Sequence, residues 1–495
     1  MTKEYEIVIG LEVHVELATK TKIFCGCSTA FGGAPNTHTC PVCTGMPGTL
    51  PVLNRQVVEY AIAVGLATNC SITQYCKFDR KNYFYPDNPQ NYQISQLYLP
   101  VCRNGYVEIE TAEDNMTKEC SNGLYGVQEG ERNRKRIGIH EIHMEEDAGK
   151  LIHDETEGSS LVDYNRSGVP LIEIVSEPDM RSADEVIAYL EKLRTTIQYL
   201  GASDCKLQEG SMRADVNISV REKGAAGLGT RTEMKNLNSF HAIRHAIEGE
   251  SARQIGLIES GEKIVQETRR WDEQKRMSYT MRSKEDAQDY RYFPDPDLVP
   301  VHISEEWIGQ IRAKQPELRE AKMARYKETF GIPDYDIRII TDSKHMADLF
   351  ETTVALGAQP KKVSNWLMGE ALRILKEREE DAEAIRFSPA HLTTLIALVD
   401  QKAITTTVAK EIFEVMFTED IDPSVYAEEK GLKTVHDESA LRRTVEQVIA
   451  DNPQSVADYR GGKEKAIGYL VGQTMRAMKG KADPESVKRL LVELL

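Results

Sequence analysis

No stretch of this 495-residue sequence is apolar for long enough to cross a membrane. The longest uncharged apolar runs, such as AIAVGLA at 61–67, are far shorter than the ~20 residues that a membrane-spanning helix needs. The first residues, MTKEYEIVIG, lead directly into a strand-like stretch and show no signal-peptide or transit-peptide pattern. We therefore expect a cytoplasmic protein with no membrane association.

Three common active-site signatures are also missing. The sequence contains no G-x-x-x-x-G-K-[ST] phosphate loop, no G-x-G-x-x-G dinucleotide turn and no G-x-S-x-G nucleophile elbow. The net charge of −16, from 62 basic and 78 acidic residues, argues against a non-specific nucleic-acid binder, because such proteins neutralise phosphates with clustered Lys and Arg. A local basic surface remains compatible with this charge.

Cysteine is sparse, but four of the nine cysteines lie in one short segment, CGCSTAFGGAPNTHTCPVC at 25–43. An odd total in a reducing compartment favours metal binding over disulfides. The C-x-C and C-x-x-C pairs are separated by turn-forming residues, so four thiolates come together locally, as a tetrahedral zinc site requires. An iron–sulfur cluster and buried free thiols are the alternatives. Because sulfur would fill every position, we predict a structural zinc site formed by Cys25, Cys27, Cys40 and Cys43.

The distribution of strand-like and helical sequence patterns predicts three domains. Residues 1–295 are rich in short β-like runs, interrupted by two helices at 182–201 and 239–261. Residues 296–412 are almost wholly helical in pattern, and residues 413–495 form a small helical tail.

Two local motifs that interrupt or begin secondary structure support this division. The proline-rich YFPDPDLVP at 292–300 cannot continue a helix or a central strand. At the other end of the chain, Asp483 followed by Pro484 predicts the start of the last helix.

Acidic residues recur in three strand-like segments. In GLEVHVEL at 10–17, apolar residues alternate with Glu12, His14 and Glu16, which places the three polar side chains on one face of a strand. HEIHMEEDAGK at 140–150 and PLIEIVSEPD at 170–179 add more carboxylates. A half-exposed strand with a solvated polar face is the simpler interpretation. The alternative is a site for Mg²⁺ or Mn²⁺, which prefer oxygen ligands.

The segment KFDRKNYFYPDNPQNYQISQ at 77–96 interleaves basic and aromatic residues. This combination suits phosphate groups and a stacked base. An aromatic hairpin packed in a core explains the same pattern equally well.

Taken together, these motifs resemble those of a known family. The matching segments, in chain order, are VIGLEVHVEL, GMPGTLPVLN, KFDRKNYFYPDNPQNYQISQ, MEEDAGK, NRSGVPLIEIVSEPD, KNLNSF, DYRYFPDPDL and SNWLMGE. They look like the B subunit of the bacterial-type aspartyl/glutamyl-tRNA amidotransferase. The C-terminal GKEKAIGYLVGQTMRAMKGKADPESVKRLL resembles the tail domain of that family, so the resemblance covers most of the chain.

The resemblance implies a fold and an activity. The fold is an α/β (α+β) cradle-like catalytic domain, followed by an all-α helical domain and a small α-helical tail. The family is an ATP-dependent ligase that works as a heterotrimer with an amidase A subunit and a small C subunit. The A subunit liberates ammonia from glutamine. The B subunit uses ATP and Mg²⁺ to phosphorylate the side-chain carboxylate of mischarged Glu-tRNA(Gln) and/or Asp-tRNA(Asn), which ammonia then converts to the amide.

The resemblance also assigns residues. His14, Glu146 and Glu173 match the family's metal positions, and Glu12 or Glu145 could complete the shell. Arg80 and Lys81 would contact phosphate, and the zinc would stabilise the fold without being obligatory for catalysis. The tail contains a set of basic residues that could bind the tRNA body: Lys463, Lys465, Arg476, Lys479 and Lys481. The alternative interpretation is that these residues form a solvated helix surface.

Two other functions fit parts of the sequence. One is a zinc-containing tRNA-binding subunit without its own chemistry, which would not need His14, Glu146 and Glu173 to converge on a cation. The other is a stand-alone carboxylate–amine ligase, which would turn over without tRNA and would not need a basic tail.

Overall fold

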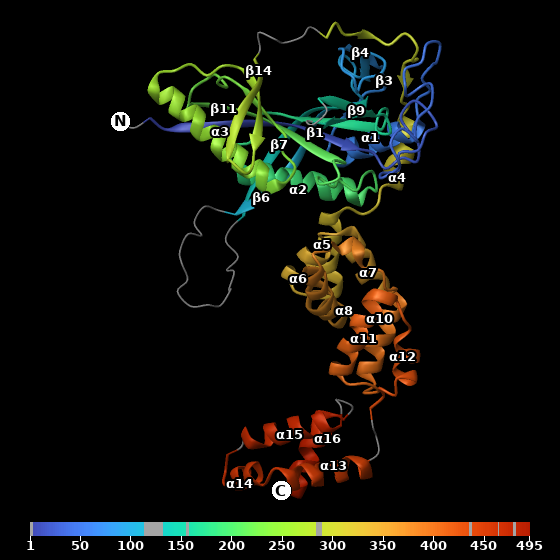
Figure 1. The fold of residues 1–495 in the computed structure, drawn as a ribbon, viewed down its shortest axis with the longest axis vertical. Helices are drawn as coiled ribbons and strands as arrows, with labels where there is room; N and C mark the ends of the chain where they lie inside the picture. The colour runs from blue at the N-terminus through green and yellow to red at the C-terminus, as the bar shows by residue number, and fades with distance from the viewer. Residues whose placement is uncertain are drawn as a thin grey trace. The chain divides into compact units, whose positions relative to one another are not determined.

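The computed structural model describes residues 3–112, 132–154, 158–283, 290–434, 438–463, 465–478 and 482–495. It divides into two compact units, Met1–Leu318 and Arg319–Leu495, which are coloured from blue to yellow and from yellow to red in Figure 1. The first unit mixes strands and helices, and the second is helical. The predicted α/β domain followed by helical parts is therefore confirmed.

The first unit contains all of the described strands and four helices. The strands are β1 Tyr5–Glu16, β2 Ser71–Ile72, β3 Tyr75–Cys76, β4 Asp79–Asn82, β5 Tyr92–Ser95, β6 Cys102–Ala112, β7 Arg132–Glu146, β8 Lys150–Asp154, β9 Ser159–Asp163, β10 Pro170–Ser176, β11 Met212–Glu222, β12 Thr232–Lys235, β13 Glu267–Asp272, β14 Met277–Ser283, β15 Phe293–Pro294 and β16 Val301–His302. The helices are α1 Arg55–Ala67, α2 Ala183–Tyr199, α3 Phe240–Ser260 and α4 Glu305–Lys314.

A nine-stranded sheet, ordered β14-β13-β12-β11-β1-β10-β7-β6-β2, forms the framework of this unit. Its pairings are antiparallel except for β12 with β13. The central strand β1 pairs with β10 on one side and β11 on the other. Its Leu11, Val13 and Val15 are buried, so the alternation seen in the sequence becomes one apolar and one polar face.

Helices α2 and α3 lie along the sheet (Figure 1) and contribute to the same hydrophobic core. Both begin where the sequence predicts. The Ser182 side chain accepts a hydrogen bond from the backbone N–H of Glu185, and Ser239 accepts one from Ala242, which satisfies orphan donors of the first turn. Helix α3 ends at Gly261, whose φ of 79° suits a residue without a Cβ.

The second unit contains two hydrophobic clusters. One gathers residues between Tyr326 and Ala427, and the other lies between Leu441 and Leu491. A π-helical turn, Leu367–Ala371, and a short 3₁₀ turn, Ala382–Ala384, interrupt the α-helices. The helices are α5 Arg319–Phe330, α6 Asp334–Ile340, α7 Lys344–Ala355, α8 Pro360–Trp366, α9 Leu372–Arg378, α10 Pro389–Asp400, α11 Thr406–Glu419, α12 Pro423–Glu429, α13 Glu438–Asp451, α14 Pro453–Arg460, α15 Lys465–Ala477 and α16 Pro484–Leu494.

The hydrophobic cores show to which part of the structure the residues near the predicted boundaries at 295/296 and 412/413 belong. Ile303, Ile308 and Ile311 belong to the core of the first unit, because α4 packs on α1 and the Trp307 indole donates a hydrogen bond to Glu59. Helices α11 and α12 bury Phe417 and Ala427 in the same cluster as the preceding helices. Within the described ranges, none of the helices combines the length and apolar character that crossing a bilayer requires.

Candidate functional site

The polar face of the large sheet carries a cluster of histidines and carboxylates. His14 of β1 lies opposite Glu173 of β10, which in turn lies opposite His143 of β7. Glu145 is two residues from His143 and therefore on the same face. Three strands that are far apart in the sequence thus bring these side chains to one place.

The imidazole nitrogens and carboxylate oxygens of this cluster lie close to one another. His14 Nδ1 lies 3.2 Å from Glu145 Oε1 and 3.8 Å from Glu173 Oε2, and His143 Nε2 lies 3.1 Å from Glu173 Oε2. One ligand atom from each of His14, Glu145 and Glu173 falls within 4.8 Å of the others. We refer to these three residues as the acidic cluster.

Burial makes the electrostatics of this cluster strong. Burial lowers the pKa of His143, but the carboxylates of Glu173 and Glu141 outweigh that effect and raise it to about 10. Burial also opposes ionisation of Glu173, yet His143 and His14 hold the pKa of Glu173 below its usual range. Glu145 is only 3% exposed, and in the part of the chain that the structure describes no Lys or Arg is ion-paired with it. Two carboxylates and an imidazole in this setting fit a hard divalent cation.

The predicted trio of His14, Glu146 and Glu173 does not come together. Glu146 follows Glu145 directly in β7 and therefore points to the opposite face of the sheet. Its carboxylate accepts hydrogen bonds from the Ile94 backbone N–H at 2.9 Å and the Gln90 amide at 3.0 Å. Within the described residues, the side chain that the structure groups with His14 and Glu173 is Glu145 and not Glu146.

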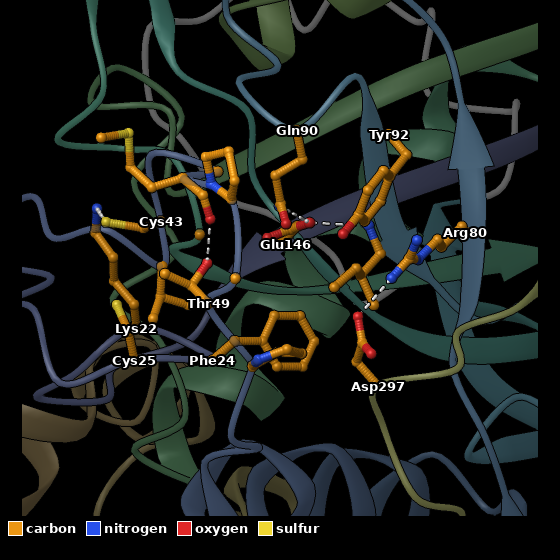
Figure 2. Close-up of a pocket in the computed structure, with 18 residues that line it drawn as sticks. Lys22, Phe24, Cys25, Cys43, Thr49, Arg80, Gln90, Tyr92, Glu146 and Asp297 are labelled. Atoms are coloured by element: carbon orange, nitrogen blue, oxygen red, sulfur yellow. Dashed lines mark hydrogen bonds and ion pairs between the residues drawn. The ribbon is translucent and has the colours of Figure 1, made fainter.

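Glu146 instead lines a cavity of about 250 Å³, shown in Figure 2. Burial raises the pKa of Glu146 to about 8. Figure 2 shows Lys22, Cys25 and Cys43 on one side of this cavity and Tyr92 and Arg80 on the other. Glu146 thus anchors the segment 90–94 at the end of β7.

A second group of carboxylates continues the polar face beyond His14. Glu12, Asp215 of β11 and Glu233 of β12 have ligand atoms within 4.8 Å of one another. Lys235 pairs with Asp215 and with Glu233, so a cation of the protein itself already balances this group. Burial is the main cause of the raised pKa of Glu12, and Glu173 adds to it. Asp215 and Glu233 were missed in the sequence, although the alternation in MRADVNISVR at 212–221 indicates the same polar face.

The two predicted phosphate-binding residues differ in their surroundings. Arg80 Nε lies 2.6 Å from Asp295, and Arg80 Nη2 lies 2.8 Å from Asp297, so its charge is largely neutralised. Lys81 points to the other side of β4, with Nζ 5.0 Å from the centroid of the Tyr290 ring, and its charge contributes to the lowered pKa of Glu173. Of the two, Lys81 is the cation whose charge acts on Glu173 of the acidic cluster.

Three tyrosine rings pack against one another near Lys81. Tyr83, Tyr290 and Tyr292 make successive edge-to-face contacts with centroid separations of 6.1 Å. Burial is the main cause of the raised pKa of Tyr83 and Tyr292, and the charge of Glu145 adds to it in both. The basic and aromatic segment of the sequence therefore packs locally, and its Tyr83 and Lys81 also interact electrostatically with Glu145 and Glu173.

The four cysteines of the 25–43 segment lie together, with their Sγ atoms within 4.8 Å of one another. The Cys25 thiol, the Cys40 backbone N–H and Lys22 lower the pKa of Cys43 to about 4, against the effect of burial. Lys22 is fully buried, and its ammonium lies 3.4 Å from Cys43 Sγ and 3.1 Å from the Tyr164 carbonyl oxygen. A buried cation needs an anionic partner, so this arrangement fits a thiolate-ligated metal.

The predicted tRNA-binding residues of the tail are only partly described. Lys463, Lys465 and Arg476 are exposed, and Lys463 lies 3.0 Å from Asp458. Lys479 and Lys481 lie outside the described residues.

Comparison with known proteins covers nearly the whole chain. A family model described as the GatB/GatE catalytic domain matches residues 7–309, and one described as the GatB domain matches residues 348–495. The chain belongs to the amidotransferase B-subunit family. The resemblance seen in the sequence motifs is therefore confirmed.

Full-length relatives of this B-subunit family are very similar to the chain. The B subunit of the aspartyl/glutamyl-tRNA(Asn/Gln) amidotransferase of Agathobacter rectalis is 71% identical over 493 residues, covering 100% of both chains. Proteins of the same name from Lachnospira eligens and Lachnoclostridium phytofermentans are 69% and 62% identical and cover 100% and 99% of the relatives' lengths. The helical tail is thus part of the common B-subunit architecture.

Proposed function

We propose that this chain is the activating subunit of a tRNA-dependent amidotransferase, an ATP-dependent ligase that forms carbon–nitrogen bonds. Its substrates would be mischarged Glu-tRNA(Gln) and/or Asp-tRNA(Asn), and its products Gln-tRNA(Gln) and Asn-tRNA(Asn). The observation that carries this proposal is the convergence of His14, Glu145 and Glu173 in a chain that matches the B subunits of this family from end to end.

The reaction has two steps. An oxygen of the substrate side-chain carboxylate forms a bond to the γ-phosphorus of ATP, while the bond from that phosphorus to the β-γ bridging oxygen breaks and ADP leaves. Ammonia then attacks the acyl carbon, the C–O bond to phosphate breaks, and inorganic phosphate leaves as the amide forms. Two anions meet in the first step, so positive charge must be placed around them.

The residues of the acidic cluster are suited to this demand. His14, Glu145 and Glu173 would hold Mg²⁺, which when bound offsets the repulsion between carboxylate and phosphate. Lys81 would add a second positive charge next to the transferring phosphoryl group. Arg80 is better suited to fix the loop of Asp295 and Asp297 than to contact phosphate, because both carboxylates already engage it.

We assign the four cysteines to a structural zinc ion. Sulfur would occupy all four tetrahedral positions and leave none open for a substrate. Buried Lys22 would offset part of the negative charge of the four thiolates. This centre would hold the 25–43 loop in place and would take no part in the chemistry.

The tail would bind the tRNA body through Lys463, Lys465 and Arg476. Because residues up to Ala427 belong to the preceding core, a deletion that tests this role should begin at residue 438, after the described segment that ends at 434. Removing 438–495 should weaken tRNA affinity and its salt dependence while leaving ATP-dependent chemistry on saturating tRNA intact. Equal tRNA affinity in the truncated protein would remove the tail from tRNA recognition.

The names of the relatives support an assembly of several subunits. A protein that is called a B subunit implies further subunits, which we propose to be an amidase A subunit that releases ammonia from glutamine and a small C subunit. The activity would take place in the cytoplasm, where mischarged tRNA is made.

The decisive experiment assays the purified complex with each mischarged tRNA, ATP and glutamine, with and without the A subunit. Amide formation that needs tRNA, and that needs the A subunit unless free ammonia is supplied, supports the proposal. Turnover on free glutamate or aspartate would favour a stand-alone ligase. Binding of tRNA without ATP cleavage would favour a zinc-containing tRNA-binding subunit, an alternative that gives no role to the acidic cluster.

A further inference from the structure

A further group of side chains that could hold a metal ion consists of His241, His245 and Glu273. His241 and His245 are four residues apart in α3, so they lie on the same side of the helix, one turn from each other. Glu273 follows the end of β13, in the turn that leads to β14. Neither the acidic cluster nor the cysteine cluster shares a residue with this group.

The three side chains converge on one point. The Nδ1 atoms of His241 and His245 each lie 3.0 Å from Oε1 of Glu273, and the two imidazole rings meet edge to face with centroids 3.9 Å apart. One ligand atom from each residue falls within 4.8 Å of the others. Adjacent ligands of a metal with bonds of about 2.1 Å are themselves about 3 Å apart, so these separations match a coordination shell.

The carboxylate of this cluster is held in position from behind. The Trp271 indole N–H donates a hydrogen bond of 2.5 Å to Oε2 of Glu273, which leaves Oε1 facing the two histidines. Trp271 is itself only 3% exposed and packs against α3, where a Cβ atom at Gly249 would lie 3.0 Å from its ring. In protein metal sites, groups that do not touch the metal often donate hydrogen bonds to its ligands and so fix their orientation, as Trp271 does for Glu273.

We propose that His241, His245 and Glu273 form a transition-metal site of the borderline class, which takes Zn²⁺ or Ni²⁺. Two imidazoles and one carboxylate are ligands typical of these ions, whereas Mg²⁺ and Ca²⁺ favour sites in which oxygen ligands predominate. Exposed fractions of 67% for the His241 side chain and 40% for Glu273 leave the remaining coordination positions to water. The site therefore differs from the closed cysteine centre in being open and exchangeable.

An ion bound at this site would connect two separate elements of the fold. Its ligands come from α3 and from the β13–β14 turn, with 28 and 32 residues separating Glu273 from His245 and His241. A bound ion cross-links these two elements and stabilises the folded state increasingly as its concentration rises. We expect binding of Ni²⁺ to raise the melting temperature of the full-length protein.

The test uses Ni²⁺ as the probe on full-length protein that retains its cysteine-bound metal. Calorimetric titration of the wild type is compared with His241→Gln, whose side chain is exposed, and with Glu273→Gln, which keeps an acceptor for Trp271. The matched control is His140→Gln, because His140 is an exposed histidine 3.0 Å from a single carboxylate, Glu177, and has no second histidine in its pair. Each variant is first compared with the wild type in the absence of added Ni²⁺ by circular dichroism and melting temperature.

The expected result is that His241→Gln and Glu273→Gln lose one Ni²⁺ equivalent, or bind it at least tenfold more weakly, and lose the Ni²⁺-dependent rise in melting temperature. His140→Gln should behave as the wild type does. Unchanged stoichiometry and affinity in His241→Gln would overturn the proposal, as would an equal loss in His140→Gln. Because amidation is not measured, a negative result here leaves the proposed enzymatic function unaffected.

Discussion

The cysteine cluster and the acidic cluster bring together side chains that could hold a metal ion, and they do so by opposite means. Four cysteines lie within one segment, 25–43, and two short pairs bring their sulfur atoms together. The acidic cluster draws one residue each from β1, β7 and β10, and its closest contact joins residues 131 positions apart. The first arrangement depends on local turns and the second on the register of a large sheet.

The two clusters also balance charge differently. The sulfur atom of Cys43 has the amino group of the buried Lys22 next to it. In the acidic cluster, the carboxylate of Glu173 interacts with His14, with the neighbouring His143 and with the charge of Lys81, and a reaction between anions needs further positive charge there. We therefore expect loss of the first cluster to affect stability and loss of the second to affect catalysis.

The largest expected effect comes from Glu173→Gln. This change removes one carboxylate of the acidic cluster without changing side-chain volume, and we expect ATP-dependent amidation to fall about 100- to 1000-fold. Formation of the acyl phosphate, followed by trapping with hydroxylamine, should fall equally, while tRNA binding stays within about twofold. Glu108→Gln, an exposed carboxylate of β6, is the control, and unchanged activity in Glu173→Gln would remove this residue from the site.

A sharper test compares two neighbours in β7. Glu145→Gln should lose as much activity as Glu173→Gln, because Glu145 belongs to the acidic cluster. Glu146→Gln should lose less than about tenfold, since glutamine still accepts the hydrogen bonds from Ile94 and Gln90. Steady-state amidation rates of the two variants decide between them, and the reverse order of losses would return Glu146 to the cation cluster.

Disruption of the cysteine cluster should act on stability. Cys40→Ser removes one ligand, so we expect zinc content to fall below one equivalent and the melting temperature to drop by roughly 5 °C or more. The remaining folded complex should keep most of its specific activity. Metal analysis, melting curves and rates per folded complex measure these three quantities, and a normal melting temperature in a zinc-free protein would contradict the structural role.

A smaller effect is expected from Lys22→Met. Methionine fills the space of the buried stem but removes the ammonium that faces Cys43 and the Tyr164 carbonyl. Zinc affinity should fall about tenfold, as is usual when an outer partner of a metal ligand is lost. Competition with a coloured chelator measures this change. Lys20→Met, which alters an exposed lysine in the same segment, should leave zinc affinity unchanged.

Much of the local structure was readable from the sequence. Ser182 and Asp483 are the caps of α2 and α16, because a short polar side chain before an apolar periodic stretch satisfies the first free N–H groups. The cysteine cluster was equally readable, since its spacing is local. Family membership followed from motifs distributed along the whole chain.

The choice between Glu145 and Glu146 was not readable in the same way. Both are acidic and adjacent, and only the register of β7 against β10 decides which one faces His14. The pairing of Arg80 with Asp295 and Asp297 spans 215 and 217 residues, so no local pattern indicates that this charge is already engaged.

By itself, the sequence determined the alternation of β1, the helix caps, the four cysteines and the family, because each depends on residues within a few positions of one another or on a motif. Tertiary structure alone decided which carboxylates meet, which basic residue faces them and where His241 and His245 find Glu273. The physical reason is that these meetings depend on strand register and on helix packing, which set the face and the neighbour of each side chain across long separations in the chain.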